Sequence, residues 1–152
     1  NCGYAYPTAL GAKVGRPERP AIAYVGDGAW GMSLAEVMTA VREKIPVVAV
    51  IFDNGQWGAE KRNQIDYFDS RFLGTELDNP NFAEVARAMG AQGLTVEHED
   101  QVGDALLAAI ALNQPTVINL RLTQTLGDPF RRDAFKPPRR LLAKYAAYSA
   151  RD

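Results

Sequence analysis

The sequence has few residues that could form disulfides or zinc sites. Its 152 residues include one cysteine, Cys2, and one histidine, His98. A single cysteine excludes a disulfide within the chain and is typical of a reducing compartment, and this pair is too small for a zinc cluster. We therefore expect any bound metal ion to be held by oxygen atoms, and we interpret His98, in the acidic run EHED, as a surface residue.

Long apolar runs are also missing. No stretch approaches the roughly 20 apolar residues that a membrane-spanning helix requires, and no charged and then apolar leader is present, so we expect a cytoplasmic protein without a membrane span. A net charge of only -1 argues against nucleic acid as the main partner. Because the chain begins with Asn1 and a predicted helix follows almost at once, we expect it to be a fragment of a longer polypeptide.

Helical and strand patterns alternate along the chain. The continuous apolar runs AIAYVG and PVVAVIFDN are typical of strands buried on both faces of a parallel sheet, and GLTVE and PTVINLRL predict two more strands. Helices are predicted in PTALGAKVG, SLAEVMTAVREKI, NFAEVARAMG and DQVGDALLAAIALN. This alternation predicts the α/β class, with an open, mainly parallel sheet and helices on both faces.

Local signals refine this outline. Ser33, followed three residues later by Glu36, forms a capping box, which predicts that the second helix begins just beyond a glycine loop. Residues 55–79 have little periodicity, and a loop of this length indicates either a functional segment or a missed element. We expect residues 1–122 to form one domain and residues 123–152, with GDPFRRDAFKPPRR and a predicted helix, to pack on it as a tail.

The glycine loop GDGAWG, residues 26–31, matches the G-x-G-x-x-G pattern of dinucleotide folds. In that interpretation Gly26, Gly28 and Gly31 surround a pyrophosphate and Asp53 binds ribose hydroxyls. The intervening Asp27 argues against it, because a carboxylate repels a bare pyrophosphate by several kcal/mol in a partly desolvated site. A cation between the two would remove this conflict.

A second acceptor for such a cation follows the next strand. Residues 29–52 separate GDG from the pair Asp53 and Asn54, and these 24 residues suffice for one helix and one returning strand. Asp27, Asn54 and the backbone carbonyl of Gln56 then offer oxygen ligands at one end of the sheet. Mg²⁺ commonly binds through a few protein oxygens together with substrate phosphates. The spacing therefore predicts a magnesium and diphosphate site.

This spacing resembles the signature of the diphosphate-binding domain of thiamine diphosphate enzymes, whose fold has Rossmann-like layers. The resemblance implies that Asp27, Asn54 and the Gln56 carbonyl hold magnesium, while the loop of Gly26, Gly28, Ala29 and Trp30 holds the diphosphate. One departure is Asp53, where many members have Asn, but the ligand Asn54 is retained.

The opening segment CGYAYPTALGAK resembles the part of acetolactate synthase-like members that lies against the aminopyrimidine ring. The resemblance implies that Cys2 and Gly3 contact this ring through backbone atoms. Without it, Cys2 would be interpreted as a small buried residue, and Trp30 and Trp57 as core or interface aromatics.

Two further stretches, FDNGQWGAEKRNQ and LGDPFRRDAFKPPR, resemble the sulfoacetaldehyde acetyltransferases. The resemblance implies that thiamine diphosphate and Mg²⁺ are the cofactors and that sulfoacetaldehyde and phosphate are converted to acetyl phosphate and sulfite. Because both substrates are anions, Lys61 and Arg62 are candidate contacts, with Arg131 and Arg132 second; the alternative is that they are surface charges.

The family also implies a partner. Its activating glutamate belongs to a pyrimidine-binding domain of a second subunit, so we expect a homodimer or homotetramer and an inactive isolated fragment. Three alternatives remain open at this point. They are another acetolactate synthase-like carboligase or decarboxylase, a nicotinamide-binding oxidoreductase domain, and a noncatalytic assembly domain.

Overall fold

The computed structural model describes residues 2–126, so the predicted C-terminal helix and the candidates Arg131 and Arg132 lie outside the described residues. The elements follow one another in the order α1 (Ala5–Gly15), β1 (Ala21–Gly26), α2 (Asp27–Gly31), α3 (Glu36–Arg42), β2 (Val47–Asp53), α4 (Gly58–Tyr67), α5 (Phe82–Ala88), β3 (Gln92–Val96), the 3-10 turn η1 (Glu99–Gln101), α6 (Val102–Leu112) and β4 (Thr116–Arg121). None of the helices within residues 2–126 is both long and apolar enough to span a membrane.

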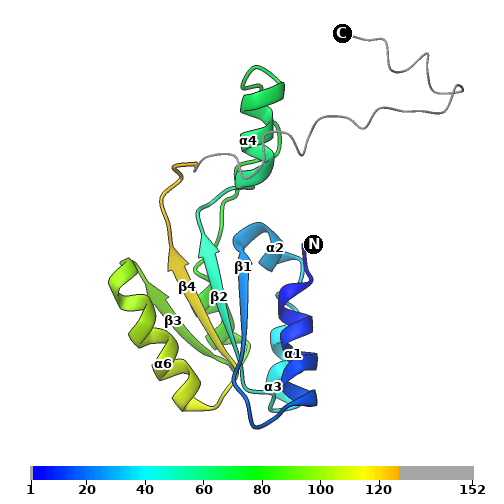
Figure 1. Ribbon diagram of the computed structural model, residues 1–152, viewed down its shortest axis with the longest axis vertical. Coiled ribbons are helices and arrows are strands. Elements are labelled where there is room, and N and C mark those ends of the chain that lie inside the picture. Colours follow the sequence, from blue (N-terminus) through cyan, green and yellow to red (C-terminus); the bar gives the residue numbers. More distant parts are fainter. Residues whose placement is uncertain (1, 127–152) are drawn as a thin grey trace, which may run out of the picture.

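The strands form one parallel sheet in the order β1-β2-β4-β3 (Figure 1). β2 and β4 occupy the two inner positions, and from Val47 to Ile51 every residue of β2 is buried. This explains the continuous apolar pattern of PVVAVIFDN, because an inner strand of a parallel sheet is covered on both faces. The predicted α/β class with a parallel sheet is confirmed.

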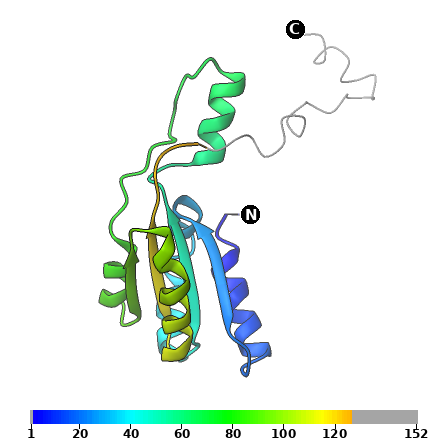
Figure 2. The same ribbon diagram turned by 60° about the vertical axis from the view of Figure 1, so that its left-hand side comes forward.

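Helices cover both faces of the sheet. On one face Val47, Ala49 and Ile51 pack in a core cluster with side chains from α1, α2, α3 and α5. On the other face Val48 and Val50 pack with Ala109 of α6. Figures 1 and 2 show α1 and α3 on one side of the strands and α6 on the other. The alternating side chains of one strand therefore serve two separate cores.

The predicted capping box is wrong. α2 begins at Asp27, directly after β1, and α3 begins at Glu36 with Ala35 as its N-cap and no side-chain cap bond. Ser33 is instead buried between the two helices, where its Oγ lies 3.5 Å from the Trp30 carbonyl. The glycine loop is itself helical and places Trp30 in the core, so Ser33 follows a helix and is not the cap of one.

The long loop predicted over residues 55–79 contains a missed element, α4. None of the side chains of α4 is buried, so the helix has no apolar periodicity that a sequence pattern could reveal. It projects away from the sheet beyond the carboxyl ends of the strands (Figures 1 and 2). An ion pair one turn apart, Arg62 with Asp66 at 3.2 Å, lies along it.

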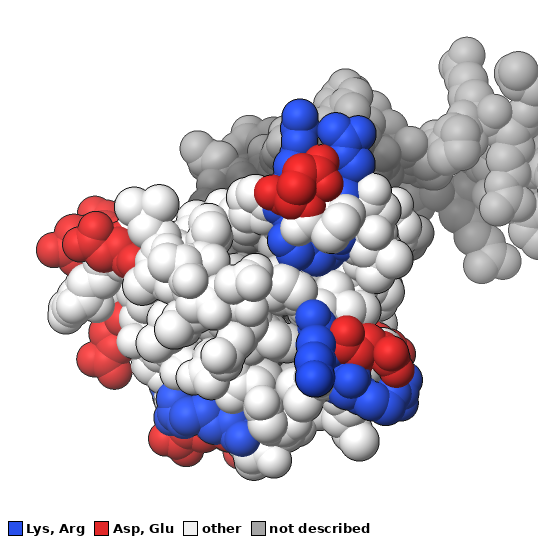
Figure 3. Space-filling view, turned by 90° about the horizontal axis from the view of Figure 1, so that it is seen from below, with Lys and Arg blue, Asp and Glu red and all other residues white. Residues whose placement is uncertain are grey.

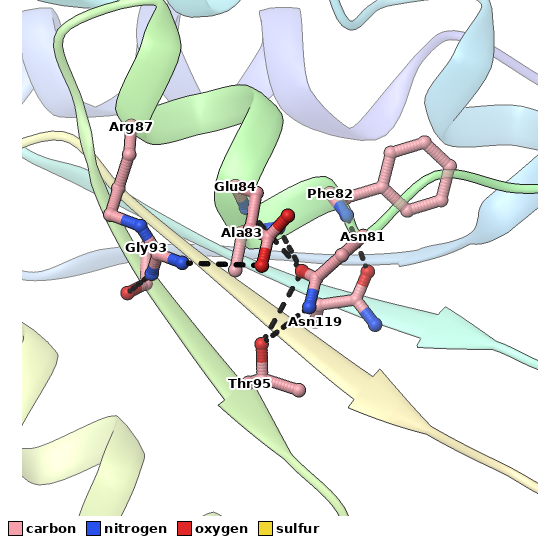
Figure 4. A network of polar contacts seen from close by, with 8 residues as sticks. All are labelled: Asn81, Phe82, Ala83, Glu84, Arg87, Gly93, Thr95 and Asn119. Carbon is pink, nitrogen blue, oxygen red and sulfur yellow. Dashed lines mark hydrogen bonds and ion pairs between the residues drawn. The ribbon is translucent and has the colours of Figure 1, made fainter.

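A polar network joins the start of α5 to the sheet (Figure 4). Asn81 is the N-cap, and its Oδ1 accepts the amide protons of Ala83 at 2.9 Å and Glu84 at 3.4 Å. Its Nδ2 donates to the Thr95 hydroxyl of β3, and the Phe82 amide donates to Asn119 Oδ1 of β4 at 2.9 Å. The path of the chain into α5 is thereby fixed against two strands.

Charged side chains at the opposite end of the molecule lie in small mixed groups. In Figure 3, which views the protein from below, basic side chains lie beside acidic ones among the described residues. Arg16 pairs with Glu18 at 2.9 Å and Arg42 with Glu43 at 2.7 Å, and all four side chains are largely exposed. Such pairs contribute little to stability, and their opposite charges limit any extended field over this face.

Candidate diphosphate and magnesium site

The predicted ligands meet where β1 and β2 end. These strands are parallel neighbours, with Gly26 opposite Phe52, so Asp27 and Asn54 follow adjacent strand ends. Open α/β sheets bind ligands at the carboxyl ends of their strands. The returning strand that the 24-residue spacing required is β2, and it brings the two segments together.

A cavity of about 290 Å³ opens between these segments. Seven of the predicted site residues line it, together with Phe52, Trp57 and the first turn of α4: Cys2, Gly26, Asp27, Gly28, Ala29, Asn54 and Gln56. The volume is close to the lower limit for small-molecule pockets, about 300 Å³. The structure thus gathers residues from three separate parts of the sequence around one space.

Asp27 is the buried acid of the site, with only 3% of its surface exposed. Its Oδ1 accepts the Gly28 amide proton at 2.9 Å, and its Oδ2 accepts the Gly55 amide proton at 2.8 Å. Bonds to a charged oxygen are stronger than neutral ones, so they hold the carboxylate in one orientation. They also show that the Gly28 amide, one of the predicted diphosphate donors, is engaged by Asp27.

The backbone of Gln56 faces away from a short bridge that its neighbours form. Gln56 faces Glu76 in an isolated antiparallel bridge, whose two bonds run from Trp57 N to Thr75 O and from Leu77 N to Gly55 O, each 2.8 Å. Both bonds skip Gln56, so its own N–H and C=O point to the opposite side. There the Gln56 amide donates to Asn54 Oδ1 at 3.3 Å.

These oxygens fit a hard divalent cation. Among the described residues no cluster of three or more His, Cys, Asp or Glu side chains could hold a metal. The candidate set has a different composition, with one carboxylate, one amide oxygen and one backbone carbonyl. Mg²⁺ prefers such oxygens and keeps several positions for water or phosphate.

Gly28 fits a site that requires close approach. A Cβ atom there would lie 2.7 Å from Cε2 of Trp57 and 2.8 Å from both Cδ2 and Cζ2. The indole ring therefore lies directly against the glycine loop and forms one wall of the cavity. A side chain at this position would displace either the ring or the loop.

Comparison with known proteins identifies the family. Residues 1–120 match the model of the thiamine pyrophosphate enzyme, C-terminal TPP binding domain. The chain belongs to this family. It is 56% identical to a sulfoacetaldehyde acetyltransferase of Castellaniella defragrans, over 98% of this chain and 26% of that protein. It is also 36% identical to an acetolactate synthase of Mycobacterium avium, over 76% of this chain and 20% of that protein.

A solved structure agrees with this assignment. The thiamine diphosphate-dependent 4-hydroxybenzoylformate decarboxylase of Rhodococcus jostii RHA1 superposes with a TM-score of 0.76 at 28% identity, covering 82% of this chain and 24% of that one. The chain thus spans only about a fifth to a quarter of the length of these relatives. The family assignment sets aside the nicotinamide-binding alternative.

The structure shows the surroundings of three further residues that were predicted to bind the cofactor. Cys2 is exposed at the cavity, so its interpretation as a buried residue is wrong. Gly3 does not line the cavity, and a Cβ there would lie 3.2 Å from Cβ of Met32. The Trp30 side chain is fully buried and makes an edge contact with Tyr6, with ring centroids 5.1 Å apart, so its interpretation as a core aromatic is confirmed.

Tyr6 is also fully buried beneath α2. Burial raises the pKa of its phenol well above the ordinary value of 10.0, and the nearby Glu36 carboxylate raises it further. The Tyr6 hydroxyl and the Trp30 indole N–H have no partner among the described residues. The contact between Tyr6 and Trp30 therefore packs the glycine loop against α1.

The cationic candidates lie on α4, outside the cavity lining. Lys61 forms an ion pair with Glu76, donates to Gln56 Oε1 at 3.0 Å and lies 5.4 Å from the centre of the Phe72 ring. Arg62 pairs with Asp66. Lys61 therefore holds the side chain of a cavity residue, whereas Arg62 is engaged within its own helix.

Sequence reasoning missed three polar residues that adjoin Asp27 directly or through one another: Asp53, Asn79 and Asn119. Asp53 was considered as a ribose ligand and as a departure from the family pattern, but not as a neighbour of Asp27. Asn119 stands inside the apolar run PTVINLRL, and a lone amide in a buried strand is a signal that could have been followed. Asn79 lies in an aperiodic segment and gave no signal.

Proposed function

We propose that this chain is the magnesium- and diphosphate-binding domain of an enzyme that converts sulfoacetaldehyde and phosphate to acetyl phosphate and sulfite. The identity of 56% over nearly the whole chain to a sulfoacetaldehyde acetyltransferase supports this choice of reaction. The cavity at the ends of β1 and β2 is the observation that carries the proposed binding role.

In this proposal Asp27, Asn54 and the Gln56 carbonyl hold Mg²⁺. Asp27 is fixed by its bonds to the Gly28 and Gly55 amides, and the Gln56 amide donates to Asn54 Oδ1, which keeps the Gln56 backbone next to Asn54. When bound, thiamine diphosphate supplies the nucleophile and electron sink of the reaction.

The remaining cavity residues have positioning roles in the proposal. The amide of Ala29, in the first turn of α2, has no partner within the helix and can donate to a diphosphate, and we propose the next amide, that of Trp30, as a second donor. The exposed Cys2 and its neighbour Gly3 offer backbone atoms to an aminopyrimidine ring. Trp57 and Gly28 pack together as one wall and limit the entry of water.

For the anionic substrates we propose contacts from α4. Lys61 supports this role because its Nζ reaches Gln56, a residue of the cavity wall, and only 17% of its side chain is exposed. Arg62 is the second candidate on the same helix, and Arg131 and Arg132 lie outside the described residues. A cation near the cavity would offset the charge of sulfonate or phosphate.

The proposal includes a second subunit. The activating glutamate would come from a pyrimidine-binding domain of that subunit in a cytoplasmic homodimer or homotetramer. Because this chain spans about a quarter of its relatives' length, the whole protein has room for such a domain.

The experiment uses the full-length protein. Sulfite and acetyl phosphate are measured after addition of sulfoacetaldehyde and phosphate, and thiamine diphosphate is titrated calorimetrically with and without Mg²⁺. We expect Asp27→Ala to lose magnesium-dependent binding, whereas Asp104→Ala, an exposed acid on α6, should bind like the parent. Binding by Asp27→Ala that equals the parent's would refute the site.

The identity of 36% to an acetolactate synthase supports a second candidate, a carboligase of the same family. The same assay separates the two. Formation of acetolactate from pyruvate, without sulfite release from sulfoacetaldehyde, would favour the carboligase. Acetyl phosphate formation that depends on inorganic phosphate would favour the acetyltransferase.

A further inference from the structure

Asp27 receives three hydrogen bonds that leave one part of its carboxylate open. Among the described residues, Oδ1 accepts one bond, from the Gly28 amide. Oδ2 accepts two, from the Gly55 amide at 2.8 Å and from Nδ2 of Asn79 at 2.7 Å. A carboxylate oxygen offers about two lone-pair sites, so Oδ2 is saturated and Oδ1 keeps one site. Oδ1 is therefore the oxygen available to a cation.

Asn79 joins Asp27 to a second buried carboxylate. Its Nδ2 donates one proton to Asp27 Oδ2 and the other to Asp53 Oδ1, at 2.9 Å. Because both carboxylates accept from the same nitrogen atom, their two negative charges lie close together. Both are also largely out of water, since Asp27 is 3% exposed and Asp53 is 6% exposed. Repulsion would separate them without the shared donor. A divalent cation at Asp27 would offset both charges.

The far end of this chain of bonds is anchored in the fold. Asp53 Oδ2 accepts a proton from Asn119 Nδ2 at 3.0 Å. Asn119 is fully buried, and its amide orientation is set because Oδ1 accepts the Phe82 amide proton of α5 (Figure 4). Asp53 is thus held from one side by β4 and from the other by Asn79, so neither carboxylate can rotate freely.

We propose that Asn79 and Asp53 position Asp27 for magnesium: the Asn79 amide occupies Oδ2 so that Oδ1 alone faces the cation, and Asp53 adds a second negative charge behind it. This rests on the proposed magnesium site. Asn79 is 52 residues from Asp27 in the sequence and belongs to neither ligand segment. It is a positioning residue, because it acts on the cation through Asp27.

Substitution of Asp53 has a specific consequence in this network. In the parent, each oxygen of Asp53 accepts a proton from one neighbour, Asn79 Nδ2 or Asn119 Nδ2. Asp53→Asn replaces one of these oxygens by an NH₂ group, so two hydrogen-bond donors then face each other at that position. The orientation of Asn119 is fixed by Phe82, so it cannot turn to relieve the conflict. The variant loses the charge and one bond while it keeps the shape of the side chain.

The test measures the dissociation constant of Mg²⁺ in the full-length protein, stripped of metal and saturated with thiamine diphosphate. Partners of metal ligands typically change metal affinity by about 10- to 100-fold, so we expect Asn79→Ala and Asp53→Asn each to weaken Mg²⁺ binding at least tenfold. With Mn²⁺ as the probe, the paramagnetic resonance spectrum of Asn79→Ala should differ from the parent's, because the Asp27 ligand is no longer held in one orientation.

Asn81→Ala is the matched control. Asn81 lies two residues from Asn79 and caps α5, but it has no bond to either carboxylate among the described residues. We expect it to lower the melting temperature and to leave the Mg²⁺ dissociation constant within twofold of the parent's. An equal loss of affinity in Asn81→Ala and Asn79→Ala would show a general stability effect and overturn the proposal.

Two further outcomes distinguish this inference from the magnesium site itself. If Asp27→Ala loses Mg²⁺ while folded Asn79→Ala binds it like the parent, the positioning role is wrong and the site stands. If Asp27→Ala also binds like the parent, both are wrong. Should Asn79→Ala fail to fold, Asp53→Asn decides in the same way, since unchanged affinity in that variant would contradict the role of the network.

Discussion

Gly28→Ala tests the glycine loop directly. The added Cβ would lie 2.7 to 2.8 Å from three atoms of the Trp57 ring. Carbon atoms are in favourable contact at about 3.5–4.0 Å, so the ring or the loop must move by roughly 0.8 Å. Overpacking of this kind typically costs about 1–3 kcal/mol. Any movement of the loop also shifts the Gly28 amide, which holds Asp27 Oδ1.

We expect Gly28→Ala to weaken binding of thiamine diphosphate in the presence of Mg²⁺ by about tenfold, which corresponds to about 1.4 kcal/mol. Calorimetric titration of the full-length protein measures this. The control is Gly31→Ala, three residues on in the same helix, where an added Cβ would meet nothing within 4 Å. That variant should bind like the parent, because alanine is a good helix former.

A double variant separates the steric cause from others. In Gly28→Ala with Trp57→Leu the smaller side chain leaves room for the new Cβ, so the two effects should not add. The double variant should bind more tightly than the sum of the single losses predicts. Binding by Gly28→Ala within twofold of the parent would refute the reasoning, as would losses that add fully.

Two other variants test the surroundings of the site. In Gly93→Ala the new Cβ would lie 2.0 Å from the Ala83 carbonyl oxygen, so α5 must shift on β3; we expect a loss of at least about 2 kcal/mol, seen as a lower melting temperature, and an unchanged melting temperature would contradict the packing. Lys61→Ala should raise the Michaelis constant of sulfoacetaldehyde or phosphate at least several-fold, whereas Arg42→Ala, an exposed cation on α3, should not; unchanged constants for both substrates would remove Lys61 from the site.

The regular elements were readable from local patterns. The continuous apolar runs at β1, β2 and β4 are strands of the structure. Two of the four predicted helices contain α5 and α6 in full, and a third begins two residues after the start of α1. These patterns are reliable because burial selects apolar residues. A strand covered on both faces is apolar throughout, and a helix buried along one side has apolar residues at helical spacing. The second predicted helix was wrong at its start, since Ala35 and not Ser33 is the N-cap of α3.

The long segment between β2 and α5 could not be predicted in the same way. α4 buries none of its side chains, so its residues carry no period. Beyond α4 the chain turns back toward residues 55–57 before it arrives at Asn79. The bonds that hold it there, such as Trp57 N to Thr75 O and Leu77 N to Gly55 O, join residues far apart in the sequence. A local pattern holds no information about such pairings.

The sequence by itself determined the parallel α/β class, the family and the spacing that brings Asp27 and Asn54 to adjacent strand ends. Those properties follow from period, composition and the length of one helix and one strand. Only the tertiary structure decided that Asn79 and Asp53 adjoin Asp27, that one carboxylate oxygen stays open, and that Trp57 covers Gly28. Contacts between distant residues depend on the whole path of the chain, and the buried hydrogen bonds that fix them form only when the fold is complete.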